Sequence, residues 1–192
     1  VAGSSSQMQF EQVVMEAHEL FGISYATKTI LTDSPQSFTA LLAAGFSDQF
    51  AYHLIKERLY GSGVGEFLGV LTALDASGLG PTVSVAKEVG QAADTITYRN
   101  VLDMRARCWG YSNAMWIANH DTMPQLMLLN QAVGTGGIPV WQPSAREDHP
   151  DMLLGRPLVF SEYAKTLGDQ GDIGIYNWNE YLEGTLQPMQ QE

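Results

Sequence analysis

The chain has 192 residues, 45% of them hydrophobic, enough to bury the core of one good-sized domain or of two small ones. Its formal net charge is −11, and its one dense basic group is Arg99, Arg105 and Arg107, so we expect no specific nucleic-acid binding. No stretch approaches the roughly 20 uninterrupted apolar residues of a membrane helix. The single cysteine, Cys108, excludes an internal disulfide or a thiolate zinc cluster.

The first third of the chain predicts an extended arm followed by one long helix. Residues 10–32 are rich in β-branched and aromatic side chains, which predict two extended segments interrupted at Gly22. Pro35 suits the first turn of a helix. Apolar residues then recur at three- and four-residue steps, which predicts a long helix over residues 34–60 that ends at Gly61.

Glycine-punctuated residues 61–71 and a second break at 78–81 predict a domain junction. A second helix is expected over residues 97–109, closed by Gly110. A buried strand is expected over 114–118. Asn119 or Asp121 can cap a third helix, which the periodicity extends to about residue 131, with Pro124 in its first turn.

Residues 134–150 are rich in glycine, proline and charge, which predicts mostly loop with a short strand at 138–141. Two further strands are expected over residues 157–161 and 172–176. Helices and strands of mixed order, with one very long helix and an extended arm, indicate an α+β fold rather than a regular doubly wound sheet.

Several short motifs invite a catalytic or binding interpretation, and each has a plainer explanation. Glycines 61, 63 and 65 close a helix, whereas a phosphate loop opens one. Ser112 lies in a stretch that resembles a nucleophile elbow but lacks the second glycine. The pair His120 and Asp121 points in divergent directions on a helix. Asp169 and Asp172 flank a glycine without the alternating carboxylates of a calcium loop, which favours a turn.

The histidines give no metal-binding pattern, because none is spaced for joint coordination. Their positions are 18, 53, 120 and 149. We expect no cofactor and no metal. A serine hydrolase that uses Ser112 or Ser62 with one of the histidines stays open as a remote alternative.

Residues 153–163, with the sequence LLGRPLVFSEY, closely resemble a signature of tailed-phage major capsid proteins with the HK97-like fold. The family pattern continues with a loop, a Gly-Asp pair, a strand and an aromatic segment, which resemble residues 171–182 here. The glycine stretch ending at residues 67–71 looks like the loop after the family's spine helix. Residues 113–119 resemble its strand entering a helix.

The resemblance implies a division of the chain. Residues 1–21 would be the return strand of an extended loop, the E-loop. Residues 22–78 would form a peripheral (P) domain around the spine helix 34–60, residues 79–176 an axial (A) domain, and residues 177–192 a return toward the P domain. The family's amino-terminal arm, outgoing E-loop strand and final P-domain strands have no counterpart here, so we expect a fragment.

The resemblance also implies a function. A major capsid (head) protein is a structural protein and not an enzyme, and it assembles into the pentamers and hexamers of an icosahedral phage or prophage shell around double-stranded DNA. Its location would be the virion, after assembly in the bacterial host cytoplasm. Expected partners are other copies of the chain, with scaffold, prohead protease and portal, and packaged DNA only non-specifically; no membrane is expected.

Self-assembly contacts are expected in the arm and in the loop after residue 133, and no crosslinking residue is carried over because residues 1–20 contain no lysine. An encapsulin-type compartment shell, which shares the fold, is the main alternative function. The expected contact residues are Met8, Phe10, Val13, Thr135, Gly136, Gly137 and Arg146.

Overall fold

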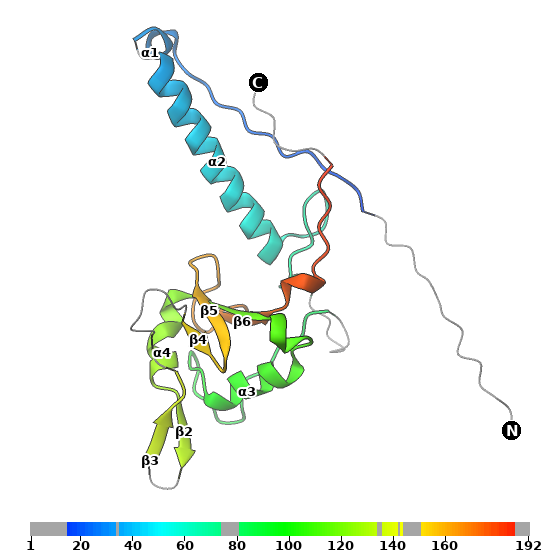
Figure 1. Ribbon diagram of the computed structural model, residues 1–192, viewed down its shortest axis with the longest axis vertical. Helices are drawn as coiled ribbons and strands as arrows, with labels where there is room; N and C mark the ends of the chain where they lie inside the picture. The colour runs from blue at the N-terminus through cyan, green and yellow to red at the C-terminus, as the bar shows by residue number, and fades with distance from the viewer. Residues whose placement is uncertain are drawn as a thin grey trace, which may run out of the picture.

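The structure, a computed structural model, describes residues 15–33, 35–73, 81–133, 136–141, 143 and 151–186. A long helix, α2, stands away from a body of mixed helices and strands, and a two-stranded hairpin projects from the opposite end of that body (Figure 1). None of the helices in the described ranges has the length and apolar character needed to span a membrane.

Residues 15–27 form an exposed arm without regular secondary structure, and α1 follows at Lys28–Asp33. The arm comes close to α2 at Gly22, where an added Cβ would lie 2.9 Å from Cε1 of Phe46. The predicted extended conformation up to residue 32 is therefore wrong at its end. There the Thr32 hydroxyl donates to the carbonyl of Lys28 at 2.9 Å, a bond that a threonine can make within a helix. Residues 10–14 of that prediction lie outside the described part.

The long helix α2 spans Pro35–Tyr60 and has 26 residues, which confirms the predicted helix from Pro35 onward. Its last turn packs into the molecule, since Leu59 is buried. Further up the helix the apolar stripe is only partly covered: Leu42, Phe46, Phe50 and Leu54 are half-buried, whereas Leu41 is 69% exposed. A helix with exposed apolar residues on a partly covered stripe has surface left for a partner.

The chain doubles back directly after α2. The amide of Gly69 donates to the carbonyl of Gly61, and the amide of Leu71 donates to Leu59, each at 2.9 Å. A Cβ on Gly61 would overlap the carbonyl of Phe67, so only glycine allows this close return. The predicted end of the helix at Gly61 is confirmed.

The body is built on a four-stranded sheet in the order β4-β5-β1-β6. β1 pairs parallel with β5 and antiparallel with β6, and β4 forms a short antiparallel pair with β5. The predicted strands at 114–118, 157–161 and 172–176 are confirmed to within one residue at each end, whereas β4 was missed. The strands are β1 (Met115–Ala118), β4 (Met152–Leu153), β5 (Arg156–Phe160) and β6 (Ile173–Tyr176).

A two-residue turn joins β4 to β5. Leu154 and Gly155 both have positive φ, 49° and 80°, as a tight hairpin turn of the primed type requires. The turn is held to the body, because the Tyr111 hydroxyl donates to the carbonyl of Leu154 and Nε of Arg156 donates to that of Ala114, each at 2.7 Å.

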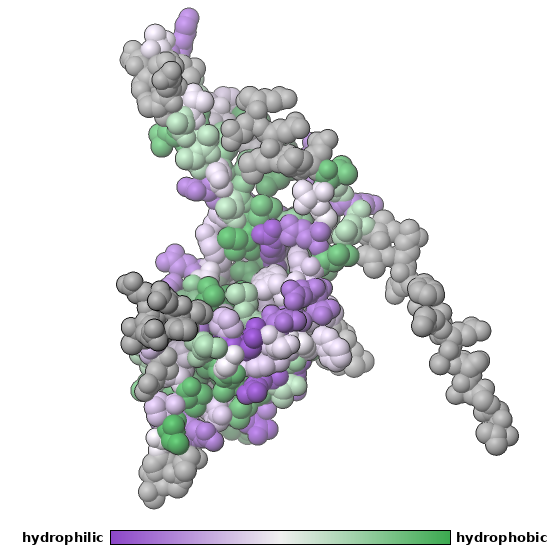
Figure 2. All heavy atoms as spheres, in the orientation of Figure 1, coloured by the Kyte–Doolittle hydropathy of each residue, from purple (hydrophilic) through white to green (hydrophobic). Residues whose placement is uncertain are grey.

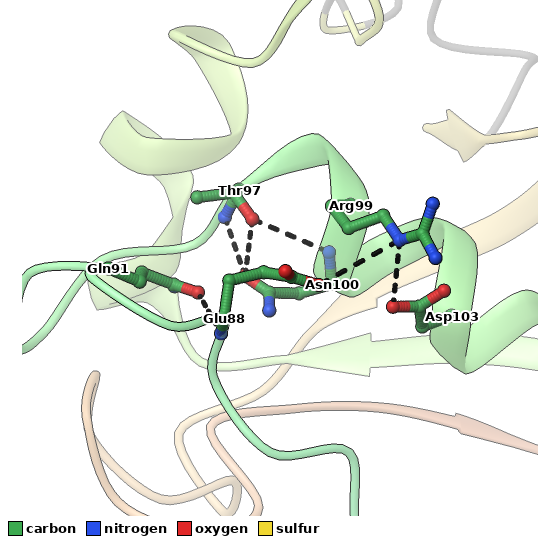
Figure 3. Close-up of polar contacts among 6 residues, drawn as sticks. All are labelled: Glu88, Gln91, Thr97, Arg99, Asn100 and Asp103. Atoms are coloured by element: carbon green, nitrogen blue, oxygen red, sulfur yellow. Dashed lines mark hydrogen bonds and ion pairs between the residues drawn. The ribbon is translucent and has the colours of Figure 1, made fainter.

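The predicted second helix is α3, Tyr98–Arg107, and Gly110 beyond it has a left-handed φ of 62°. Thr97 and Asn100 form a capping box, in which each side chain accepts from the other's backbone amide. Arg99 bonds Asp103 one turn later at 3.0 Å, as Figure 3 shows. These contacts fix where α3 begins and so place its fully buried Val101 in the core.

The predicted third helix is much shorter than the periodicity indicates. Asn119 caps the 3-10 turn η2 (His120–Thr122), and α4 covers only Met123–Met127. The chain then enters β2 (Asn130–Val133), which pairs antiparallel with β3 (Gly136–Pro139). The extension of the helix to residue 131 is wrong, and so is the assignment of residues 136–137 to a loop, because pairing across this hairpin overrides the local helical pattern.

The hydrophobic core lies in the body, between the sheet and the helices α3 and α4. Two further 3-10 turns flank it, η1 at Tyr111–Asn113 and η3 at Trp178–Glu180. The buried cluster contains Ile96, Val101, Trp116, Ala118, Leu126, Leu129, Trp141, Leu153 and Leu158.

Candidate assembly surfaces

The junction between α2 and the body is held by three polar contacts from residues far apart in sequence. Arg58 makes two hydrogen bonds to the carboxylate of Glu183, at 3.0 and 2.9 Å. The Tyr60 hydroxyl donates to the carbonyl of Tyr163 at 2.7 Å. The Tyr181 hydroxyl donates to Leu68 in the loop after α2, at 3.1 Å. The orientation of the long helix is therefore set by its last turn.

Aromatic rings cluster around the same junction. The ring centroid of Trp178 lies 5.7 Å from that of Tyr176 and 5.7 Å from that of Tyr181. Burial raises the pKa of Tyr176, with smaller contributions from Tyr60 and Asp172. The ammonium of Lys165 lies 5.1 Å from the centroid of the Tyr60 ring. In Figure 2, apolar atoms gather where α2 meets the body.

A first exposed apolar surface follows the arm and the upper part of α2. Phe21 and Tyr25 on the arm are 77% and 93% exposed, and Leu41 on α2 is exposed as well. Large apolar side chains held in water at this density mark an interaction surface. We call these residues the arm–helix surface; its exposed members are Leu20, Phe21, Ile23, Tyr25, Ile30 and Leu41.

A second exposed apolar surface lies at the far end of the body. Met127 and Leu128 close α4, Leu128 is 72% exposed, and Ile138 on β3 is 59% exposed. These three residues, which we call the hairpin surface, lie beside buried Leu126 and Leu129. The hairpin thus exposes apolar area next to a rigid core.

The predicted contact residues fall mainly outside the described part of the chain. Gly136 and Gly137 open β3. Gly137 is exposed and lies against Asn130, whose Cβ would be 3.1 Å from an added Cβ. The neighbouring hairpin surface was not identified from sequence, although apolar Leu128 and Ile138 around a glycine pair were its signal. The remaining predicted contacts, Met8, Phe10, Val13, Thr135 and Arg146, lie outside the described residues.

The motifs weighed for chemistry take the roles of turns. Gly63 and Gly65 have positive φ in the loop after α2. The carboxylate of Asp172 accepts from the amides of Gly168 and Ile173, at 3.0 and 2.7 Å, which confirms its predicted turn role. Burial raises the pKa of Asp172, and these two bonds oppose that shift.

The histidine and serine positions do not assemble into a site. The His120 ring stacks on Phe160 with centroids 5.8 Å apart. Across the described ranges, no hydrogen bond joins Ser62 or Ser112 to a histidine. In the same ranges no group of three or more His, Cys, Asp or Glu side chains could hold a metal ion.

Comparison with known proteins agrees with this architecture. The model of the phage capsid family matches residues 1–190. No curated protein matches the chain. The solved structure "Capsid of empty GTA particle computed with C5 symmetry" is similar, with a TM-score of 0.65 and 22% identity. "Capsid of native GTA particle computed with C5 symmetry" has a TM-score of 0.58 and 18% identity.

Each similarity covers 84% of this chain and 56% of the capsid chain, so the protein described here spans little more than half the length of those subunits. A long free-standing helix, a mixed sheet and this shared architecture define an α+β protein with the HK97-like fold, as predicted. The chain belongs to the phage capsid family.

Proposed function

We propose that the chain is part of a major capsid (head) protein whose copies form the pentamers and hexamers of an icosahedral phage or prophage shell around double-stranded DNA. The observation that carries this proposal is the pair of exposed apolar surfaces at opposite ends of an elongated subunit. A subunit that contacts neighbours through two different surfaces can close into rings, because a heterologous contact repeated by rotation generates a closed assembly.

The same proposal assigns the parts of the chain. Residues 1–21 are the return strand of the E-loop, 22–78 the P domain, 79–176 the A domain and 177–192 the return toward the P domain. The separation of α2 from the body supports this division. In this assignment the hairpin surface faces the ring centre and the arm–helix surface covers a neighbouring subunit.

The expected contacts of the assembled shell follow from this assignment. Met8, Phe10 and Val13 extend the arm's interface, and Thr135, Gly136, Gly137 and Arg146 extend that of the hairpin. We propose that scaffold, prohead protease and portal act on the whole capsid protein in the bacterial cytoplasm. The net charge of −11 supports contact with packaged DNA that is weak and independent of sequence.

The proposal is tested by assembly of the intact reading frame that contains this chain. We expect rings or shells by electron microscopy and sedimentation, and we expect Leu128→Asp with Ile138→Asp to leave soluble subunits whose circular dichroism matches that of the parent. Val64→Asp with Val89→Asp is the matched control, because both valines are exposed on loops outside both surfaces. If the hairpin variant still assembles, the assignment of the hairpin to the A domain is wrong. If the parent protein stays monomeric in the presence of its scaffold, the proposed function is wrong.

A further inference from the structure

Strand β6 ends the sheet and has an unpaired edge. The sheet order places β6 next to β1 alone. β6 pairs with β1 through Ile173↔Ala118 to Tyr176↔Met115, and no other strand among the described residues pairs with it. An open edge of this kind can accept a further strand.

The register shows which backbone groups face the open side. The amide of Asn119 donates to the carbonyl of Asp172 at 2.9 Å, which makes this a hydrogen-bonded pair of the antiparallel ladder. Because such pairs alternate, Gly174 and Tyr176 also bond to β1, whereas Ile173 and Ile175 direct their amide and carbonyl groups away from it. The outward amide of Ile173 is taken by the carboxylate of Asp172. Ile175 keeps its amide and carbonyl unbonded within the described ranges.

This edge lies along an open groove of about 1110 Å³. Its lining includes Met104 and Arg107 from α3, and Val70 and Leu71 from the loop after α2. Trp178 lines the groove beyond the end of β6. The groove therefore combines free backbone bonding groups with apolar walls, as grooves that bind an extended peptide do.

The ionisable side chains that line the groove are mostly negative. Its lining contains seven carboxylates against two cationic side chains, Lys87 and Arg107. Glu183 is neutralised by Arg58, and none of the other six forms an ion pair within the described residues. These six are Glu16, Glu66, Asp94, Asp169, Asp172 and Glu180. An occupant with cationic side chains would meet complementary charge.

Three of the stretches outside the described ranges have no cationic side chain to offer the groove. Residues 1–14, 74–80 and 187–192 contain no lysine and no arginine. We propose that the groove beside β6 binds an extended, lysine- or arginine-rich segment of a partner protein, which adds a strand to the free edge at Ile175. This inference does not depend on the proposed capsid function.

Binding is tested on the chain with a fluorescent peptide that alternates lysine and valine, by anisotropy at low salt. We expect saturable binding, and we expect Asp169→Lys with Glu180→Lys to weaken it about tenfold. Asp48→Lys with Glu162→Lys is the matched control, since both of these carboxylates are exposed and lie outside the groove. If both double variants lost the same amount of peptide affinity, the loss would come from net charge alone, and the proposed site would be wrong.

Strand addition has its own readout. Amide hydrogen exchange at Ile175 is expected to slow by about tenfold with peptide bound, because its outward amide gains an acceptor. Two peptides, N-methylated at every lysine or at every valine, keep the charge but each lose one row of donors, and the peptide whose lost row faces β6 is expected to bind at least about tenfold more weakly. The proposal would be overturned by unchanged exchange at Ile175, by undiminished binding of both N-methylated peptides, or by equal binding of a glutamate–valine peptide.

Discussion

Arg58 and Glu183 form a two-point ion pair between residues 125 positions apart, with Nε to Oε2 at 3.0 Å and Nη2 to Oε1 at 2.9 Å. The bonds to Glu183 raise the pKa of Arg58, while partial burial opposes that shift. The pair ties the last turn of α2 to the segment that follows η3. Together with the bond from Tyr60 to Tyr163, this contact holds the long helix in its orientation.

A double-mutant cycle with Arg58→Met and Glu183→Gln is expected to give a coupling energy of about 0.5–1 kcal/mol, because the geometry is bidentate and the pair is only partly exposed. Urea unfolding measures it, and salt is expected to reduce it. The exposed pair Arg99 and Asp103, one helical turn apart, is the comparison, with about 0.3–0.5 kcal/mol expected. A coupling energy of zero between Arg58 and Glu183 would mean that this ion pair does not hold the junction.

The cap of α3 gives a second prediction. Thr97→Ala removes the side chain that accepts from the Asn100 amide and is expected to lower the free energy of unfolding by about 1 kcal/mol. Thr97→Ser keeps the hydroxyl and is expected to cost much less. Thermal or urea denaturation of the two variants checks this, and equal losses would show that the methyl group of Thr97 matters rather than its cap.

Signals that are local in sequence predicted much of the fold. The ends of α2 and α3 were predicted because capping residues and glycines act within one turn, and β1, β5 and β6 were predicted because a buried strand is a short apolar run. The hairpin of β2 and β3 was not predicted, because neither strand alone indicates that Asn130 pairs with Pro139.

The candidate surfaces were less predictable than the fold. The resemblance pointed to the arm and the loop after residue 133, but no periodicity indicates that Tyr181 bonds Leu68, 113 residues away. Whether Leu128 or Ile138 is covered depends on which elements pack over it. Exposure of that kind is a property of the tertiary structure.

Two glycines in opposite settings give a third prediction. Gly155 has a φ of 80°, and an added Cβ there meets open space. Gly155→Ala is therefore expected to cost about 1 kcal/mol from the backbone alone. Gly45 lies within α2, where a Cβ also meets nothing, so Gly45→Ala is expected to stabilise by roughly 0.5–1 kcal/mol. Denaturant unfolding checks both signs, and destabilisation by Gly45→Ala would contradict the exposed helical setting.

Tyr176 is a buried residue, and its ionisation makes stability depend on pH in the alkaline range. Because burial raises its pKa above the ordinary value of 10.0, the folded state holds this proton more tightly than the unfolded state. The corresponding stability is complete below pH 10 and is lost as the pH rises above that value.

Tyr176→Phe is expected to remove that part of the alkaline loss, because phenylalanine fills the same space without an ionisable group. Urea unfolding at several pH values from about 8 to 11 measures the slope. Tyr25→Phe, at a ring 93% exposed on the arm, controls for the loss of a tyrosine hydroxyl as such. If Tyr176→Phe leaves the alkaline slope of the parent unchanged, ionisation of Tyr176 does not limit folding, and the aromatic junction opens before that proton is lost.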